Sequence, residues 1–203
     1  LARHAVAEFK LPLVGPFSSA GPMQTGGEWY WFVMLGTVLN PENVSSPWVF
    51  LTVLYALFPA FMIYLGKELE DRRFGIILGL LTLVSTAQIA QSVSLTNQSP
   101  LIFSSGFALL AMIKFLKTKR LKFLLLLGFF VSAGITFHFQ GIALISFLLF
   151  TIIIGKAGIR GVLASLGGFF IPLIPLLIFD LQNDFVNLRN IIQYFLHDQY
   201  KVS

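Results

Sequence analysis

The chain has 203 residues, of which 56% are hydrophobic and only 11% are charged. A soluble domain carries roughly 25% charged residues, so this composition excludes an ordinary soluble protein and predicts an integral membrane protein. The absence of cysteine excludes disulfides and thiol chemistry within this sequence. The net charge of +5 comes from basic residues at the ends of apolar runs, which predicts contact with a lipid bilayer rather than with nucleic acid.

Residues 1–47 are predicted to form an outer loop that contains an interfacial helix. The stretch LPLVGPFSSAGPMQTGG is rich in Gly, Pro and Ser and is typical of a loop. The following run, EWYWFVML, is too short to span a bilayer, so we expect a helix over residues 28–39 that lies at headgroup depth. Because residue 1 is Leu and no signal peptide is apparent, we interpret the chain as an internal fragment of a longer protein.

Residues 48–180 are predicted to form a polytopic bundle of about six transmembrane helices, and residues 181–203 an outer juxtamembrane segment. A spanning helix needs about 20 mostly apolar residues, so several of the spans must tilt or thin the bilayer. The polar HFQG stretch indicates a tight turn between the fourth and fifth spans, with a single re-entrant hairpin as the alternative. The six apolar runs are Trp48–Leu65, Phe74–Ile89, Leu101–Phe115, Leu121–Phe137, Gly141–Ile154 and Val162–Phe179.

Three alternate loops, residues 67–73, 114–122 and 155–160, carry ten of the 14 Lys and Arg residues. The positive-inside rule therefore places these loops in the cytoplasm of a multi-pass protein of the cell membrane. The other side then holds all three histidines and six of the nine acidic residues. We expect any chemistry to take place on that outer face.

Glu28 is the leading candidate for a catalytic residue. It follows Gly26 and Gly27, which permit close backbone approach or a sharp turn, and it precedes three aromatic residues. Gln24, Trp29 and Tyr30 are candidate substrate-binding neighbours, since aromatic rings suit the apolar faces of sugars. The alternative is a helix N-terminal acid that complements the dipole, with Thr25 as a cap, beside an interfacial aromatic belt.

Two further polar groups occur on the predicted outer side. Asn97 and Gln98 offer amide donors and acceptors, and His138 and Gln140 flank the predicted turn. We treat these residues as candidate substrate-binding residues, against the alternative of ordinary polar turns. No second histidine lies at metal-ligand spacing, so the sequence assigns no metal ligand, and metal dependence stays open.

The last outer segment offers a phosphate-binding candidate. If the final span continues outwards as a helix, Asp180 and Asp184 lie one turn apart, and Arg189 follows. Arg189 suits a phosphate because its guanidinium donates paired hydrogen bonds. An ordinary solvated helix is the alternative. The sequence contains no P-loop, dinucleotide-binding fingerprint, HExxH or GxSxG motif, which argues against soluble nucleotide chemistry.

Three stretches, taken in order, resemble membrane glycosyltransferases of the GT-C type from bacteria and archaea. They are FKLPLVGPFSSAGPMQTGGEWYWFVML, TNQSPLIFSSGFALLAMIKFLKTKRLKFLLLLGFFVSAGITFHFQG and FFIPLIPLLIFDLQNDFVNLRNIIQYF. The nearest group is the protein-mannosyltransferase and aminoarabinose-transferase-like family.

This resemblance implies an enzyme that takes a sugar from a polyprenyl-phosphate carrier on the outer face and passes it to a glycan, a lipid or a protein. It implies no firm cofactor. It also implies a principal catalytic Asp just after a first transmembrane helix, which would precede residue 1. Glu28 departs from the family pattern, because relatives often have a Gly-Pro-Leu-Tyr-Tyr-like run at this position.

Two other functions stay open. A transporter or lipid flippase predicts charges inside spans or paired broken helices. The predicted spans contain almost no charge, although Gln88 is a partial exception. A non-catalytic membrane scaffold predicts no convergent polar cluster in the outer loops.

Overall fold

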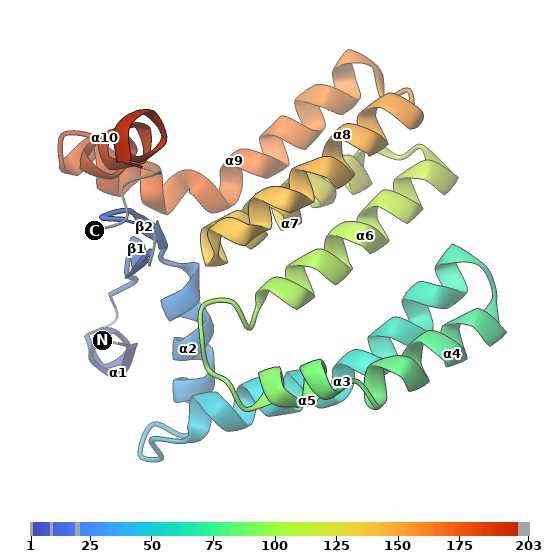
Figure 1. The fold of residues 1–203 in the computed structure, drawn as a ribbon, viewed down its shortest axis with the longest axis horizontal. Coiled ribbons are helices and arrows are strands. Elements are labelled where there is room, and N and C mark those ends of the chain that lie inside the picture. Colours follow the sequence, from blue (N-terminus) through green and yellow to red (C-terminus); the bar gives the residue numbers. More distant parts are fainter. Residues whose placement is uncertain (1, 9, 19–20, 199–203) are drawn as a thin grey trace.

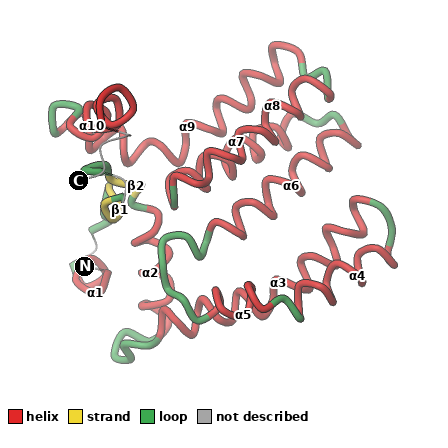
Figure 2. The backbone as a smooth tube through the Cα atoms, viewed as in Figure 1, coloured by secondary structure: helices red, strands yellow, loops and turns green. Residues whose placement is uncertain are grey.

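A computed structural model describes residues 2–8, 10–18 and 21–198, and most of them are helical (Figure 2). The only sheet in the described residues is an antiparallel hairpin of two short strands near the N-terminus. The predicted helical class is therefore confirmed. The elements are α1 (Ala2–Ala7), β1 (Val14–Phe17), β2 (Gln24–Gly26), α2 (Glu28–Leu39), α3 (Ser46–Leu69), α4 (Arg72–Leu83), α5 (Thr86–Ser92), α6 (Leu101–Thr118), α7 (Leu121–Phe137), the 3-10 helix η1 (Phe139–Leu144), α8 (Ile145–Ile154), α9 (Gly158–Gln182), α10 (Val186–Gln193) and a π-helical turn (Tyr194–Asp198).

Three helices, α3, α6 and α9, are long and apolar enough to cross a membrane. A fourth span exists if the bent pair α4–α5 crosses as one unit. α7 has 17 residues and α8 has 10, so each falls short of the roughly 20 residues that a span needs. All six predicted apolar runs are helical, but length and composition support three or four spans among the described residues rather than six.

The predicted span over residues 74–89 is wrong as a single helix. α4 ends at Leu83, α5 begins at Thr86, and the two helices are bent by 59°. Ser85 is extended between them, and its hydroxyl accepts a hydrogen bond from the backbone N–H of Gln88 (3.4 Å). A serine N-cap satisfies a backbone donor that a new helix would otherwise leave unpaired. Ser85 therefore starts a second helix within a stretch that is mostly apolar.

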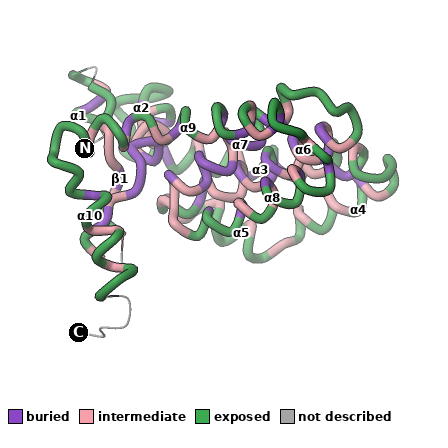
Figure 3. The backbone as a smooth tube through the Cα atoms, turned by 90° about the horizontal axis from the view of Figure 1, so that it is seen from above, coloured by how far each residue is buried: buried purple, intermediate pink, exposed green. Residues whose placement is uncertain are grey.

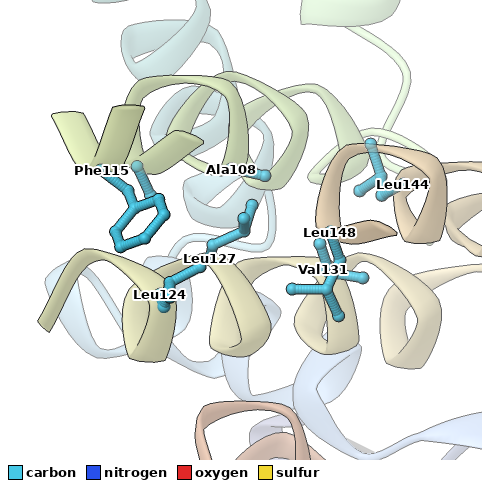
Figure 4. Packing of buried hydrophobic residues seen from close by; sticks show 8 residues of the cluster. Ala108, Phe115, Leu124, Leu127, Val131, Leu144 and Leu148 are labelled. Atoms are coloured by element: carbon cyan, nitrogen blue, oxygen red, sulfur yellow. The ribbon is translucent and has the colours of Figure 1, made fainter. Parts of the chain in front are cut away.

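The buried core is centred on α7. Leu124, Leu127 and Val131 of α7 are fully buried, and they pack with Phe115 of α6 and Leu148 of α8 (Figure 4). The opposite face of α7 meets α9 through small residues. A Cβ on Gly128 would lie 2.0 Å from the carbonyl oxygen of Ser165, and one on Gly168 would lie 1.9 Å from that of Leu125. The two glycines therefore let the backbones touch, as helices in membranes commonly do.

The two ends of the bundle differ in charge. The α3–α4, α6–α7 and α8–α9 connections all lie at one end (right in Figure 1), and they contain the three basic loops. Lys114 of α6 pairs there with Glu68 of α3 at 2.6 Å. At the opposite end, α2 runs between α3 and α7 across the direction of the long helices, beside the hairpin and α10 (Figure 1).

Much of the outside of the bundle is exposed (Figure 3), and many of its exposed side chains are large and hydrophobic. Leu80 of α4, Ile153 of α8 and Leu163 of α9 are examples of large hydrophobic side chains that are more than half exposed. A soluble protein rarely exposes apolar area on this scale, whereas lipid tails would cover it. These surfaces agree with the spans that helix length and composition indicate.

Candidate functional site

Glu28 is held at the corner between the hairpin and α2. β1 pairs with β2 in antiparallel register, with Val14 opposite Gly26, and α2 begins two residues after the strand ends. Glu28 is therefore in the first turn of α2, as the sequence predicted. Thr25 does not cap this helix, contrary to the alternative raised from sequence: its hydroxyl donates to the carbonyl oxygen of Pro16 (3.3 Å), and the N-cap residue is Gly27.

The two glycines before Glu28 are required by close packing within the protein. A Cβ on Gly26 would lie 2.1 Å from Oε2 of Glu28, and one on Gly27 would lie 2.0 Å from the carbonyl oxygen of Pro12. Gly26 thus leaves room for the Glu28 carboxyl group to fold back against the strand. The sequence predicted that these two glycines permit close approach of another group. In the structure the approaching groups are the Glu28 side chain and the backbone at Pro12.

The Glu28 carboxyl group is buried without a hydrogen bond. Its residue is 9% exposed, and neither carboxyl oxygen has a partner among the described residues. Burial raises the pKa of Glu28 to about 7, while its own backbone N–H and the Thr136 hydroxyl act in the opposite direction. The Thr136 hydroxyl is itself committed to the carbonyl oxygen of Ala133 (3.0 Å). A buried acid with an unmet hydrogen-bonding capacity and a pKa near neutrality suits proton transfer.

Glu28 is the only charged residue that lines a large apolar pocket between α2, α3, α6, α7 and α9. The pocket has a volume of about 530 Å³. We call it the apolar pocket. It is lined by Glu28, Trp31, Phe32, Leu35, Leu54, Leu57, Phe58, Phe61, Pro100, Phe103, Ser104, Phe107, Phe129, Phe130, Ala133, Phe137, Ile171 and Pro172.

A second, polar pocket gathers three of the predicted binding residues. It has a volume of about 280 Å³ and is lined by Phe17, Ser18, Thr25, Thr96, Asn97, Gln98, His138 and Phe139. We call it the histidine pocket. Asn97 donates its amide to the carbonyl oxygen of Phe137 (3.2 Å), which ties the α5–α6 loop to the end of α7.

His138 is held in one orientation within this pocket. Its Nδ1 accepts the backbone N–H of Gln140 (3.2 Å), and its Nε2 lies 3.2 Å from the side-chain amide of Gln98. Burial lowers the pKa of His138, which favours the neutral ring. With Nδ1 accepting, a neutral ring carries its proton on Nε2, the atom that faces the Gln98 amide nitrogen. The Gln98 amide must therefore be turned for its oxygen to accept this proton.

The apolar and histidine pockets share a boundary made of short chain segments. Thr25 lines the histidine pocket and Glu28 the apolar pocket, three residues apart. Gln98 and His138 likewise line the histidine pocket, while Pro100 and Phe137, one or two residues away in the chain, line the apolar pocket. The buried acid itself lines the apolar pocket only, close in sequence to a residue of the histidine pocket.

Gln140 lines a third pocket, which we call the glutamine pocket. It has a volume of about 320 Å³ and is lined by Tyr55, Ala87, Gln88, Gln91, Gln98, Leu101, Ile102, Ser105 and Gln140. Gln98 belongs to both this pocket and the histidine pocket. Two predicted binding residues are thereby brought beside Gln88 and Gln91, which the sequence did not single out as binding residues.

Trp29 and Tyr30 lie apart from the Glu28 side of α2. They line a separate pocket with Arg3, Val33 and Thr37. Trp31, Phe32 and Leu35 line the apolar pocket instead, because they follow Glu28 at spacings of three, four and seven and so share its helix face. That spacing is present in the sequence and identifies Trp31 and Phe32 as the aromatic neighbours of the acid. Trp29 stacks on Phe32 at 6.1 Å and so supports this wall indirectly.

Two polar residues near the C-terminal end of the described chain hold α10 in place. Asp180 is buried at the end of α9 and accepts the backbone N–H groups of Asn187 (2.8 Å) and Leu188 (3.2 Å) of α10. Asn187 in turn exchanges two hydrogen bonds with the backbone of Gln24, at 2.7 and 3.2 Å. These contacts fix α10 against the hairpin.

One expectation about this segment changes, and one stays untested. Asp184 does not continue the helix one turn beyond Asp180, because α9 ends at Gln182 and Asp184 has a left-handed φ of 51°. Arg189 is exposed on α10 and lines none of the three pockets. Its contact with a carrier phosphate stays a prediction.

No protein-family model, curated protein or solved structure matches this chain. Among the residues that the structure describes, no group of three or more His, Cys, Asp or Glu side chains is placed to hold a metal ion.

Proposed function

We propose that the chain acts in a glycosyltransferase that takes a sugar from a polyprenyl-phosphate carrier at the outer face of the cell membrane. The acceptor is a glycan, a lipid or a protein. The observation that carries the proposal is the buried, unpartnered carboxyl group of Glu28 in the wall of the apolar pocket, three residues from Thr25 in the wall of the histidine pocket. The resemblance of the three quoted stretches to GT-C enzymes supports the same reaction class.

The apolar pocket suits the isoprenoid chain of such a carrier. Its wall consists almost entirely of aromatic and aliphatic side chains, contributed by helices that include the three candidate spans α3, α6 and α9. Pockets for small molecules are mostly apolar with a few placed polar groups, and this pocket has Glu28 and Ser104 as its polar residues.

Glu28 is proposed to accept the proton of the acceptor hydroxyl group. As that oxygen bonds to the anomeric carbon, the bond between this carbon and the phosphate oxygen breaks, and the carrier phosphate leaves with the electron pair. A general base works best with a pKa near the operating pH, and burial brings the pKa of Glu28 to about 7. His138 and Asn97 line the histidine pocket and are already engaged there with Gln98 and the carbonyl oxygen of Phe137, so they shape its wall.

A lipid flippase is the second candidate, because the bent pair α4–α5 is a broken helix of the kind that transporters use. Transporters commonly place such breaks in two related halves of the fold. The described residues contain one, so this observation favours the flippase less than the acid and its pockets favour the transferase.

The experiment uses the protein at its natural length in phosphatidylcholine liposomes, with a diazirine-bearing polyprenyl-phosphate sugar. We expect crosslinks to the residues of the apolar pocket and transfer of the labelled sugar to acceptor. Glu28→Gln should keep the crosslinks and lower turnover by about tenfold or more, which is about 1.4 kcal/mol in the barrier. Glu42→Gln, at an exposed acid, is the matched control.

The outcomes separate the candidates. Normal turnover in Glu28→Gln removes this residue from the reaction, and crosslinks elsewhere remove the carrier from the apolar pocket. Movement of the carrier between leaflets without sugar transfer would instead identify a flippase.

A further inference from the structure

The glutamine pocket has an unusual lining for the outer end of a membrane bundle. Four glutamines, from α5, the α5–α6 loop and η1, surround one volume of about 320 Å³. Among the residues that the structure describes, no Asp, Glu, Lys, Arg or His lines it. The polar lining of this pocket is therefore dominated by amides, which donate and accept hydrogen bonds but carry no charge.

These amides are largely uncommitted. The Oε1 atom of Gln88 is buried and has no hydrogen-bond partner among the described residues, and the Gln88 side chain lines both this pocket and a smaller one beside Thr52 and Thr82. Gln91 uses only its carbonyl, which faces the Ser99 hydroxyl at 3.4 Å, and the Gln140 side chain makes no hydrogen bond within the described part of the chain. A buried polar atom without a partner costs free energy, so the arrangement indicates a ligand or water that pairs with it.

The remaining wall is apolar. Leu101, Ile102 and Ala87 line the same volume, and Tyr55 adds an aromatic ring whose hydroxyl is already donated to the carbonyl oxygen of Ser99 (2.8 Å). A sugar presents hydroxyl groups at its edge and C–H groups on its faces. Amides that both donate and accept suit the hydroxyl groups, and the aliphatic side chains suit the faces.

We propose that the glutamine pocket is a binding site for an uncharged carbohydrate. A phosphate or a carboxylate is disfavoured there, because no cation is present to offset its desolvation. Gln98 lines both this pocket and the histidine pocket, so the bound sugar lies next to the proposed reaction site. That the sugar serves as acceptor rests on the proposed function, whereas its binding does not.

Binding is tested by saturation-transfer-difference NMR on the chain in phosphatidylcholine nanodiscs, which avoids detergents with sugar headgroups. The probes are glucose, mannose, galactose and their disaccharides, with glucose 6-phosphate as the charged comparison. We expect a saturation-transfer signal at the ring protons of at least one neutral sugar. The signal for glucose 6-phosphate should be at least fivefold weaker. Gln140→Leu and Gln88→Leu should each reduce the signal at least fivefold.

Gln182→Leu makes the same chemical change at an exposed residue outside the three pockets and should leave the signal intact. Gln140 is exposed, so its variant decides the matter even where Gln88→Leu fails to fold. The proposal is overturned if no neutral sugar gives a signal or if Gln140→Leu binds normally. Glu28→Gln separates the two proposals, because it should bind the neutral sugar normally. If the protein binds sugar but transfers none, the proposed reaction is wrong and the binding site stands. If it transfers sugar but none binds in this pocket, the binding site is wrong and the reaction stands.

Discussion

Oε2 of Glu28 occupies the space that a side chain at Gly26 would need, 2.1 Å from the position of the missing Cβ. The acid and the glycine therefore form one unit: the strand β2 passes close enough to bury the carboxyl group only because residue 26 has no side chain. Thr136 of α7 closes the same space from the other side, with its Cβ 2.6 Å from that position. Proteins that bury an acid without partners commonly do so at functional sites.

Gly26→Ala should displace the Glu28 carboxyl group. Its methyl group meets both Glu28 and Thr136, and overpacking of this kind costs about 1–3 kcal/mol. We expect a lower melting temperature and a loss of any activity that depends on Glu28. Gly167→Ala is the control, because its Cβ meets nothing within 4 Å and alanine favours a helix. Equal stability of the two variants would show that the Gly26 contact does not constrain Glu28.

The stability of the chain should depend on pH through Glu28. Its pKa is raised by burial from 4.5 to about 7, so between these values the folded protein keeps a proton that the unfolded chain has lost. The contribution is fully present below about pH 4.5 and is lost as the pH rises towards 7, by about 3 kcal/mol in all. The difference in unfolding free energy between the wild type and Glu28→Gln measures it from pH 4 to pH 8. A constant difference across this range would contradict the raised pKa.

Hydropathy predicted the positions of the helices, but the sequence predicted only part of the candidate site. Apolar runs predicted every long helix, because lipid-facing and core-facing residues are both apolar in a bundle. The break at Ser85 was missed, since a single capping hydroxyl in an apolar stretch changes hydropathy very little. Trp31 was recoverable from its spacing to Glu28, whereas Thr136 was not, because it reaches the acid from a helix more than 100 residues later.

The sequence predicted the polar residues of the histidine pocket but not how they are arranged. Asn97, Gln98 and His138 stood out as polar residues next to apolar runs, and the fold brings them together. Gln88 and Gln91 did not stand out as binding residues, because their role depends on the bend that turns α5 away from α4. Tertiary arrangement, rather than residue type, decides which polar residues of such a chain meet.

Asp180→Ala should loosen α10 without affecting the apolar pocket. The substitution leaves the N–H groups of Asn187 and Leu188 without their acceptor, and the loss of a helix cap costs about 0.5–2 kcal/mol. Limited proteolysis within residues 183–193 should become faster. Glu42→Ala is the control, because Glu42 is an exposed acid in the connection between α2 and α3. Unchanged proteolysis in Asp180→Ala would show that other contacts hold α10.

The two ends of the bundle should lie on opposite sides of the membrane. Thr118 lies in the basic α6–α7 region, and Thr96 lies in the α5–α6 loop at the other end of α6, and both residues are exposed. α6, with 18 residues, is mostly apolar between these points and is one of the three candidate spans. The chain has no cysteine, so a single introduced thiol gives no background. The positive-inside rule places the basic end in the cytoplasm.

Thr96→Cys should therefore react with a membrane-impermeant maleimide in intact cells, and Thr118→Cys should react only after the cells are opened. The reverse pattern would place the pockets on the cytoplasmic face, where a carrier-linked sugar presented from outside does not reach them. Reaction of both thiols in intact cells would mean that α6 does not cross the bilayer. In that case the apolar surface of the bundle would need another explanation, because α6 separates the two ends that carry opposite patterns of charge.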